Sequence, residues 1–287
     1  MKNSQLMIAC LVLISMCLAP VVRAGEYSAN GVFSSTYVDQ EWILDSSKPF
    51  IEPSVAAPLI ETYIHDINPN RDANAPNDIS TKDLAKRIAG VSYCFHIDPF
   101  VFTSLIRQES ITYNQRADSP TGARGLTQFT TIAVEEVDDQ LGIRGNHYAR
   151  STAINYFNGV IADDCLEKNG EFKSTGSNYK PLWELDPASS SIKGSSAQAF
   201  KMAKMLVSYP EYALIYGAIL LKVNFSLVES GYKTGCYTYK DGHPETLADK
   251  FKEVVMMYNG DGCTTQKAYQ TDILGKFYPD IINADTK

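Results

Sequence analysis

The chain has 287 residues, of which 44% are hydrophobic and 11% aromatic, so it can form a packed core and is not a largely disordered chain. It carries 26 Lys and Arg against 33 Asp and Glu, a net charge of −7. This acidic balance argues against binding to nucleic acid, which requires a basic surface, and disfavours binding to anionic lipid.

The first 24 residues have the pattern of a signal peptide. Lys2 gives a positive start, the run 6–19 is apolar but too short to span a bilayer, and Val22-Arg23-Ala24 offers a cleavage site. We therefore expect a mature chain that begins at Gly25 in a periplasm or outside the cell. Cys17 suggests a lipoprotein instead, but the Met before it is large for that signal. No later segment is expected to cross a membrane.

Loss of the leader removes Lys2 and Arg23, so the mature charge is 24 − 33 = −9. Four cysteines remain, and an even number in an exported chain predicts two disulfides. Three pairings are open for Cys94, Cys165, Cys236 and Cys263. Because Cys236 and Cys263 flank a predicted helix, we expect them to pair and leave Cys94 for Cys165.

No metal and no cofactor is predicted. The cysteines have no CxxC spacing, and the four histidines are scattered without an H-x-x-x-H or H-E-x-x-H pattern. No G-x-S-x-G motif indicates a serine nucleophile.

Residues 25–90 are rich in Pro, Asn, Asp and Ser, and we expect an irregular N-terminal extension packed on a core domain over 91–287. The stretch 167–196 has loop composition and is expected to be a long insertion. Few segments alternate with period two, so the sequence predicts a mainly α-helical fold.

Three helices can be placed from their start signals. Asp98-Pro99 combines an N-cap residue with a proline at the first helical position. Ser208 to Glu211 has the spacing of a capping box and begins a second helix. The third is expected to start near Thr246, with Asp249 three residues on.

Glu109 lies on the apolar stripe of the first of these helices, after Phe102, Leu105 and Ile106. These positions share one helix face, so the carboxyl group is expected to lose hydration and to have a raised pKa. A general acid that works near neutral pH requires this property. The alternative is a carboxylate at the helix rim that pairs with Arg107 or Arg116.

Glu109-Ser110, followed by Ser119-Pro120-Thr121-Gly122-Ala123-Arg124-Gly125-Leu126-Thr127-Gln128, resembles the signature of lytic transglycosylases of glycoside hydrolase family 23. That signature reads E-S, a spacer, then S-x-x-G-A-x-G-L-M-Q. Thr127 replaces the usual Met, and the spacer is one residue longer. The segment 210–221 is similar to the family's third motif, with Ala213 for Asn and Leu220 for Tyr. Tyr258-Asn259-Gly260 resembles its Y-N-x-G motif.

The resemblance implies a lysozyme-like α-helical domain that cuts the β-1,4 bond between N-acetylmuramic acid (MurNAc) and N-acetylglucosamine (GlcNAc) in peptidoglycan. It makes Glu109 the general acid and then the base, with Tyr258 beside it. The substrate-binding residues it implies are Ser110, Gly125, Leu126, Thr127, Gln128 and Asn259. Structural roles remain open for Ser110 as a helix cap, for Gln128 as a tie within its turn and for Tyr258 as a core residue.

Asp118 is a candidate second carboxylate, because it lies close to where goose-type lysozymes, the related hydrolytic branch, carry an aspartate. The alternative is a loop residue that hydrogen-bonds its own backbone. Asp138 and Asp139 are expected to be solvated. The product is therefore open between an anhydro-muramic end and an ordinary reducing end, and the motif match favours the transglycosylase.

Two further interpretations stay open. A non-catalytic glycan-binding protein with the same fold would have no chemical need for an acid on an apolar stripe. A charge of −9 gives no long-range attraction to an anionic wall, which raises a preference for de-N-acetylated peptidoglycan as a hypothesis. We expect a monomer whose partner is the peptidoglycan glycan strand.

Overall fold

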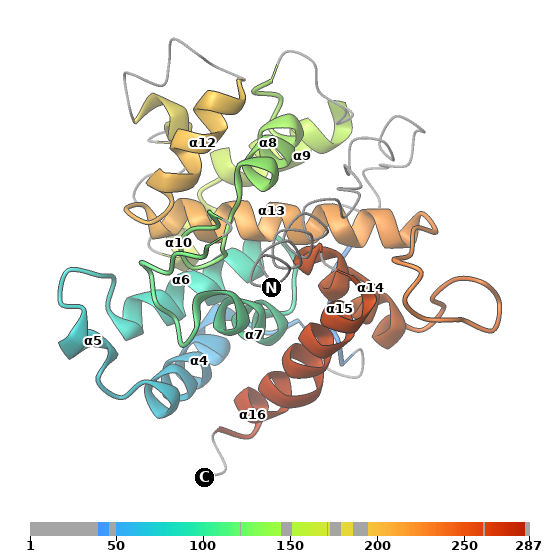
Figure 1. Ribbon diagram of the computed structural model, residues 1–287. Helices are drawn as coiled ribbons and strands as arrows, with labels where there is room; N and C mark the ends of the chain where they lie inside the picture. Colours follow the sequence, from blue (N-terminus) through green and yellow to red (C-terminus); the bar gives the residue numbers. More distant parts are fainter. Residues whose placement is uncertain are drawn as a thin grey trace, which may run out of the picture.

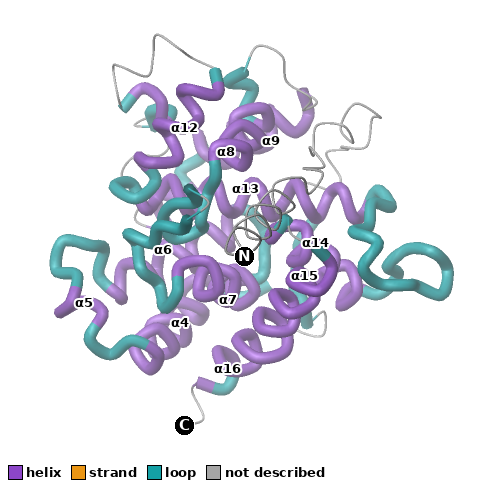
Figure 2. Tube along the Cα trace, viewed as in Figure 1, coloured by secondary structure: helices purple, strands orange, loops and turns teal. Residues whose placement is uncertain are grey.

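The computed structural model describes residues 40–45, 50–120, 122–144, 151–170, 172, 179–185, 195–260 and 262–284. This part of the chain is built from helices and loops and contains no strand (Figure 2). The predicted mainly α fold is thereby confirmed. The predicted signal peptide lies outside the described residues.

The described residues form a series of helical segments along the chain. They are α4 (Pro53–Ile67), α5 (Arg71–Asn74), α6 (Thr81–Cys94), α7 (Pro99–Ser110), α8 (Thr131–Gln140), α9 (Ser151–Ala162), α10 (Cys165–Gly170), the 3₁₀ turn η2 (Leu182–Glu184), α12 (Ser196–Met205), α13 (Pro210–Glu229), α14 (Leu247–Asn259), α15 (Cys263–Gln270), the π-helical segment η3 (Thr271–Phe277) and α16 (Tyr278–Ile282).

Helix α13 crosses the middle of the molecule, with α8, α9 and α12 on one side and α4, α6 and α7 on the other (Figure 1). It is long and apolar enough to span a membrane by length and composition, which differs from the expectation that no such segment follows the leader. Its residues are mostly buried by the surrounding helices, because it forms the centre of the core. This is the environment of a core helix, and the described residues give no clear membrane span.

All three predicted helix starts are confirmed, and two of them have the expected side-chain cap. The carboxylate of Asp98 accepts the backbone N–H groups of Phe100 and Val101, and the hydroxyl of Thr246 accepts that of Asp249. The predicted capping box at α13 is wrong, since no side chain caps this helix. Glu211, which the box would use, pairs instead with Arg87 of α6, with 3.4 Å between Oε2 and Nη1.

The N-terminal segment is more regular than its composition predicts. Residues 53–67 form α4 even though Pro58 lies inside the helix. Ala56, Ala57, Ile60, Tyr63 and Ile64 bury one face of α4, which packs mainly on α6. That burial outweighs the backbone hydrogen bond that the proline removes. Helix α6 itself continues across residue 90, where the core domain was expected to begin.

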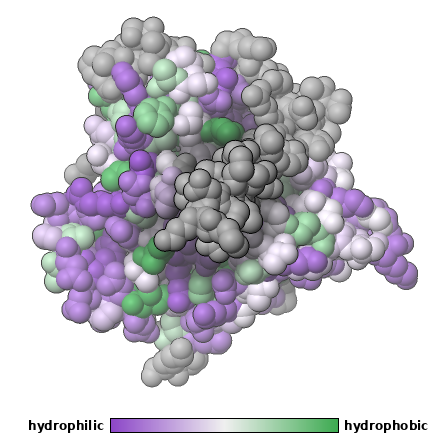
Figure 3. Space-filling model, in the orientation of Figure 1, coloured by the Kyte–Doolittle hydropathy of each residue, from purple (hydrophilic) through white to green (hydrophobic). Residues whose placement is uncertain are grey.

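Residues 40–45 bring an aromatic side chain into the core. Trp42 is fully buried and stacks on Phe225 of α13 with ring centroids 4.2 Å apart, while Phe251 of α14 meets it edge-on. The backbone N–H of Trp42 donates to the carbonyl of His96 at 3.0 Å. Outside the core, the face drawn in Figure 3 is mostly hydrophilic, with separate hydrophobic patches.

Both predicted disulfides are confirmed. Cys94 at the end of α6 joins Cys165 at the start of α10, and Cys236 joins Cys263 at the start of α15. The first pair is separated by 71 residues and the second by 27. The two cross-links are consistent with an oxidising, exported environment.

Removal of the disulfide that closes the longer loop should destabilise the protein more than removal of the other disulfide. In the chain-entropy account, Cys94→Ser with Cys165→Ser lowers the free energy of unfolding by about 4.4 kcal/mol, and Cys236→Ser with Cys263→Ser by about 3.6 kcal/mol. Urea denaturation of the two double variants beside the wild type measures both losses. A larger loss for the shorter loop would contradict this order and indicate that local packing dominates.

Candidate active site

Glu109 lies one residue before the end of α7 and is only partly accessible to solvent. Phe102, Leu105 and Ile106, which precede it on the same stripe, are fully buried. Loss of hydration raises the pKa of the Glu109 carboxyl from its ordinary 4.5 to about 7. The group is therefore largely neutral at pH values below 7, as a general acid must be.

The cations proposed as alternative partners of Glu109 are engaged elsewhere. The Arg107 guanidinium binds the hydroxyl of Tyr63 and lies 3.7 Å from the centre of the Phe277 ring. Nε of Arg116 is 2.8 Å from a carboxylate oxygen of Asp78. The interpretation of Glu109 as a surface ion pair with either arginine is therefore wrong.

Tyr269 is the hydrogen-bond partner of Glu109, and its hydroxyl donates to Oε1 of the carboxyl. The ring belongs to α15 and is 5% exposed. Burial and the neighbouring carboxyl hold the pKa of Tyr269 well above its ordinary value, so the phenol keeps its proton. Reasoning from sequence missed this residue, because it lies 160 positions from Glu109 and outside the recognised motifs.

Tyr269 reaches Glu109 because the C-terminal helices run antiparallel along α7. Segments α15, η3 and α16 form one rod beside α7 (Figure 1). At the other end of α7, the hydroxyl of Tyr278 donates to Asp98, the N-cap residue, at 3.4 Å. Phe277 meets Arg107 between these ends. The rod is therefore joined to α7 near both ends of that helix.

Tyr258 of α14 also lies near Glu109. Burial, followed by the nearby Glu109 carboxyl, holds the pKa of Tyr258 well above its ordinary value. Its hydroxyl donates to the carbonyl of Thr127 at 3.2 Å, which joins α14 to the Gly125–Gln128 turn. The structure thus brings Glu109, Tyr258 and this turn together.

Within the Gly125–Gln128 turn, the side chains stabilise the backbone. Nε2 of Gln128 donates to the carbonyl of Gly125 at 3.0 Å, and Gln128 has a left-handed φ of 47°. The hydroxyl of Thr127 donates to the carbonyl of Ala213 in α13 at 3.0 Å, while Leu126 is fully buried. The half-buried Gln128 is the side chain of this group with the most access to solvent.

Ser110 and Asn259 lie at the ends of the two helices that carry the acid and Tyr258. The hydroxyl of Ser110 is buried and donates to the carbonyl of Ile106 at 2.6 Å, so it serves its own helix. Asn259 is half-buried and is the last residue of α14, before Gly260 with φ 68°. Gly260 turns the chain towards α15.

The remaining acids lie in two different environments. Asp118 forms an ion pair with Arg124, and its side chain is 60% exposed. The expectation that Asp138 and Asp139 are solvated is wrong, because both are buried in α8. Burial raises the pKa of Asp138 to about 7, and Tyr216 of α13 donates to it at 3.1 Å. Arg144 lies beside Asp139, with Nε 3.4 Å from Oδ1.

The chain leaves α7 in a strained conformation. Ile111, Thr112 and Tyr113 have φ values of 47°, 66° and 64°, a left-handed path that costs about 1–2 kcal/mol for each non-glycine residue. Such outliers persist where the surroundings fix them. Asn68 donates to the carbonyl of Thr112 at 3.4 Å, and the buried Arg71 to that of Tyr113 at 3.1 Å. The N-terminal helices therefore hold the turn that follows the acid.

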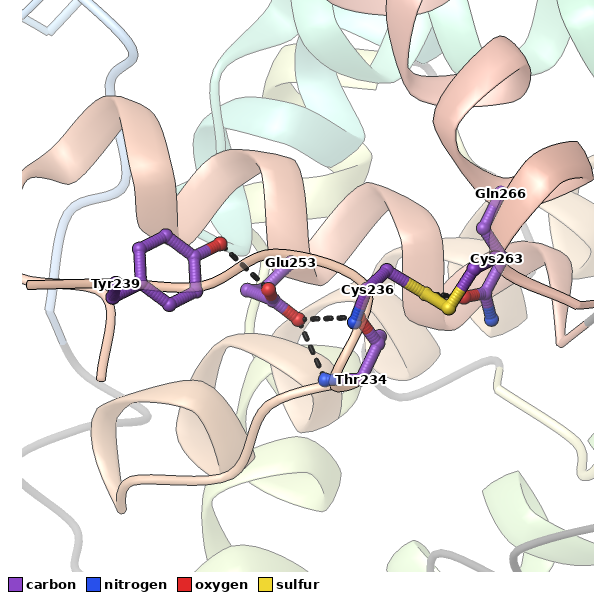
Figure 4. Close-up of a disulfide and its surroundings, with 6 residues drawn as sticks. All are labelled: Thr234, Cys236, Tyr239, Glu253, Cys263 and Gln266. Carbon is purple, nitrogen blue, oxygen red and sulfur yellow. Dashed lines mark hydrogen bonds between the residues drawn. A yellow bond between two sulfur atoms is a disulfide. The ribbon is translucent and has the colours of Figure 1, made fainter. Parts of the chain in front are cut away.

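The start of α15 is anchored by a buried carboxylate and a disulfide (Figure 4). Glu253 of α14 is fully buried and accepts from the backbone N–H of Thr234 at 2.6 Å, from its hydroxyl at 2.8 Å and from the Tyr239 hydroxyl at 2.6 Å. These bonds fix the loop that carries Cys236, which is joined to Cys263 of α15. The helix that presents Tyr269 is thus tied down six residues before the tyrosine.

A polar hollow of about 410 Å³ lies apart from Glu109, between α4 and the start of α6. Glu61, His65, Asp72 and Lys82 contribute to its wall. Asp72 accepts from the backbone N–H and hydroxyl of Thr81, and it pairs with Arg71. Asp72 therefore stabilises the local fold at this hollow.

Among the residues that the structure describes, no group of three or more His, Cys, Asp or Glu side chains could hold a metal ion. Comparison of the chain with protein-family models, curated proteins and solved structures finds no match. The chemistry of the site is therefore inferred from its own residues.

The raised pKa of Glu109 predicts how stability changes with pH. Because the folded state binds this proton more tightly than the unfolded state, the stabilisation is complete below pH 4.5 and is lost as the pH rises through 7. Between pH 4.5 and 8, the free energy of unfolding of Glu109→Gln should therefore increase relative to that of the wild type by up to about 3 kcal/mol. Urea denaturation at both pH values measures this, with Glu245→Gln, an exposed glutamate, as control. Equal trends in both variants would contradict the assignment.

The contact between α13 and the turn predicts a second, pH-independent effect. A methyl group on Gly217 would lie 2.7 Å from Cγ2 of Thr127 and 3.3 Å from the Phe102 ring. Gly217→Ala should cost about 1–3 kcal/mol by overpacking, although alanine favours a helix. Thr127→Ser removes Cγ2 but keeps the hydroxyl, so the double variant should recover about 1 kcal/mol in a double-mutant cycle of thermal unfolding. Strict additivity would contradict the clash.

Proposed function

We propose that the protein is an exported enzyme that cleaves the β-1,4 MurNAc–GlcNAc bond of peptidoglycan, and that it is a lytic transglycosylase. The observation that carries this proposal is the environment of Glu109, a carboxyl group at the end of an apolar stripe whose pKa is about 7. The resemblance of the Glu-Ser, Gly-Leu-Thr-Gln and Tyr-Asn segments to the lytic transglycosylase signature supports this substrate class. The two disulfides support the exported location.

The choice of transglycosylase over hydrolase is supported by the surroundings of Glu109, where the described residues offer no evident second acid. Glycosidases usually place two carboxylates about 5–9.5 Å apart, one of which binds a water or attacks the sugar. Among the described residues, no other carboxylate contributes by charge to the pKa of Glu109. Asp118, the sequence candidate, pairs with Arg124 and is mostly exposed. The nucleophile is then best supplied by the substrate itself, through the 6-hydroxyl of MurNAc.

The reaction assigns two successive roles to Glu109. As an acid it donates its proton to the glycosidic oxygen while the bond to C1 of MurNAc breaks. As a carboxylate it accepts the proton of the 6-hydroxyl while that oxygen bonds to C1. The product is a 1,6-anhydro-MurNAc end, and no water is consumed.

The alternative functions would either release a different product or release no product. A hydrolytic lysozyme would leave reducing MurNAc ends, and Asp118 would then hold the water. A non-catalytic glycan-binding protein would release nothing, and it would have no use for an acid whose burial lowers stability above pH 7. A preference for de-N-acetylated glycan would follow if the acidic side chains of the −9 chain line the binding surface.

Cleavage should depend on Glu109 and not on Asp118. Glu109→Gln should lower the release of fragments from purified sacculi by about 100- to 10,000-fold, the range for loss of a general acid. Asp118→Asn and the exposed control Glu245→Gln should remain near the wild-type rate. Mass spectrometry of the released muropeptides should find anhydro ends, and rates on acetylated and deacetylated sacculi test the acetylation preference.

Three outcomes would contradict parts of this proposal. Equal release of fragments by the wild type and Glu109→Gln would show that Glu109 is not the general acid. Reducing ends, together with a large loss in Asp118→Asn, favour the hydrolytic lysozyme. Binding of the wild type to sacculi without any released fragment favours the non-catalytic protein.

A further inference from the structure

We infer that Tyr269 is a positioning residue that fixes which oxygen of Glu109 carries the proton, so that Oε2 both donates to the glycosidic oxygen and later takes the proton back. This inference rests on the proposed role of Glu109 as the acid. Tyr269 lies outside the Glu-Ser, Gly-Leu-Thr-Gln and Tyr-Asn segments.

The first step is the direction of the hydrogen bond. A phenol at neutral pH is a donor, and the pKa of Tyr269 lies well above its ordinary value because the ring is buried beside Glu109. The hydroxyl therefore keeps its proton, and in the structure it donates that proton to Oε1. The bond holds whether Glu109 is neutral or charged, since Oε1 accepts in both forms.

The second step is the chemistry of a neutral carboxyl group, which has one O–H donor and one carbonyl acceptor. Because Oε1 is occupied as the acceptor, the proton of Glu109 belongs on Oε2. The other nearby phenol does not compete for that oxygen, since Tyr258 donates to the carbonyl of Thr127. Within the described part of the chain, Tyr269 is the residue whose hydrogen bond affects the Glu109 carboxyl.

The third step is the proton balance. The Oε2 proton passes to the oxygen of the departing GlcNAc as its bond to C1 of MurNAc breaks, and the electron pair of the Oε2–H bond stays on Glu109. The 6-hydroxyl oxygen then bonds to C1, and its proton returns to Oε2. Between these events the Tyr269 bond is charge-assisted and stronger, so it stabilises the carboxylate form.

Among the described residues, the titratable groups shown to interact with Glu109 are two phenols, Tyr269 from α15 and Tyr258 from α14. Loss of the Tyr269 hydroxyl removes a bond that favours the charged form, so the pKa of Glu109 must rise. A higher pKa makes Glu109 a weaker acid, so donation of its proton to the glycosidic oxygen becomes less favourable. The same substitution should therefore change the pH profile and the rate together.

The test compares three phenylalanine variants of the full-length mature protein. Tyr269→Phe removes the hydroxyl from Glu109. Tyr237→Phe is the matched control, because the Tyr237 hydroxyl bonds at 3.0 Å to Gln270, the neighbour of Tyr269 on α15. Tyr258→Phe removes a phenol that lies near Glu109 but donates to Thr127. The carboxyl pKa of Glu109 is read by NMR of protein labelled with ¹³C at glutamate side-chain carboxyls, with Glu109→Gln to assign the signal.

In Tyr269→Phe we expect the carboxyl pKa to rise by about one unit or more, the alkaline limb of the pH–rate profile to move by the same amount, and kcat on sacculus fragments to fall about 10- to 100-fold. Tyr237→Phe should change neither the pKa nor the profile. Tyr258→Phe should leave the carboxyl pKa within a few tenths of a unit of the wild type, whatever it does to the rate.

An unchanged pKa and pH profile in Tyr269→Phe would overturn the inference, as would an equal shift in Tyr237→Phe, which would indicate general loosening of α15. The NMR measurement separates this from failure of the proposed function. A wild type that releases no fragments would refute the enzyme, while the rise of the carboxyl pKa in Tyr269→Phe would still support the assignment of the proton to Oε2.

Discussion

A carboxyl group at the end of a buried helix stripe loses hydration, which disfavours its charged form. Several contacts in the surrounding structure oppose or maintain this effect at Glu109. Glu109 continues the face on which Phe102, Leu105 and Ile106 are fully buried. Desolvation alone would favour the neutral acid strongly. The Tyr269 hydroxyl opposes that effect, and the balance brings the pKa to about 7. A residue with this balance can give up its proton and recover it near neutral pH.

Keeping Tyr269 in place requires restraints from distant parts of the chain. The rod of α15, η3 and α16 is held at one end of α7 by Tyr278 on Asp98, and at its start by the Cys236–Cys263 disulfide. On the other side, Asn68 and Arg71 hold the left-handed turn that follows α7. The N-terminal segment, expected as an addition packed on the core, therefore stabilises the conformation next to the acid.

The features that sequence reasoning predicted correctly are those with local signals. Asp98-Pro99 and Thr246 with Asp249 mark helix starts within four residues, and the period of the apolar stripe identifies Glu109. Tyr269 could not be found in this way, because nothing in 263–270 encodes its antiparallel packing on a helix 160 residues away. Asp138 was misjudged because charge alone suggested solvent, whereas Tyr216 donates to it inside the core. The composition of the N-terminal segment does not predict α4, because burial of one face of this helix outweighs the unfavourable effect of Pro58.

Among the described residues, no second carboxylate affects the pKa of Glu109, and this matters for the charge that would develop in the proposed cleavage. The oxocarbenium-like transition state of glycosidic cleavage is positive. In the proposed reaction, Glu109 would be a negative group next to that charge once it has lost its proton, and the low dielectric of its surroundings would strengthen their attraction. The burial that keeps the acid neutral before the reaction thus makes its anion more effective afterwards. A single acid in this environment can serve both steps, provided that Tyr269 keeps the carboxylate accessible near neutral pH.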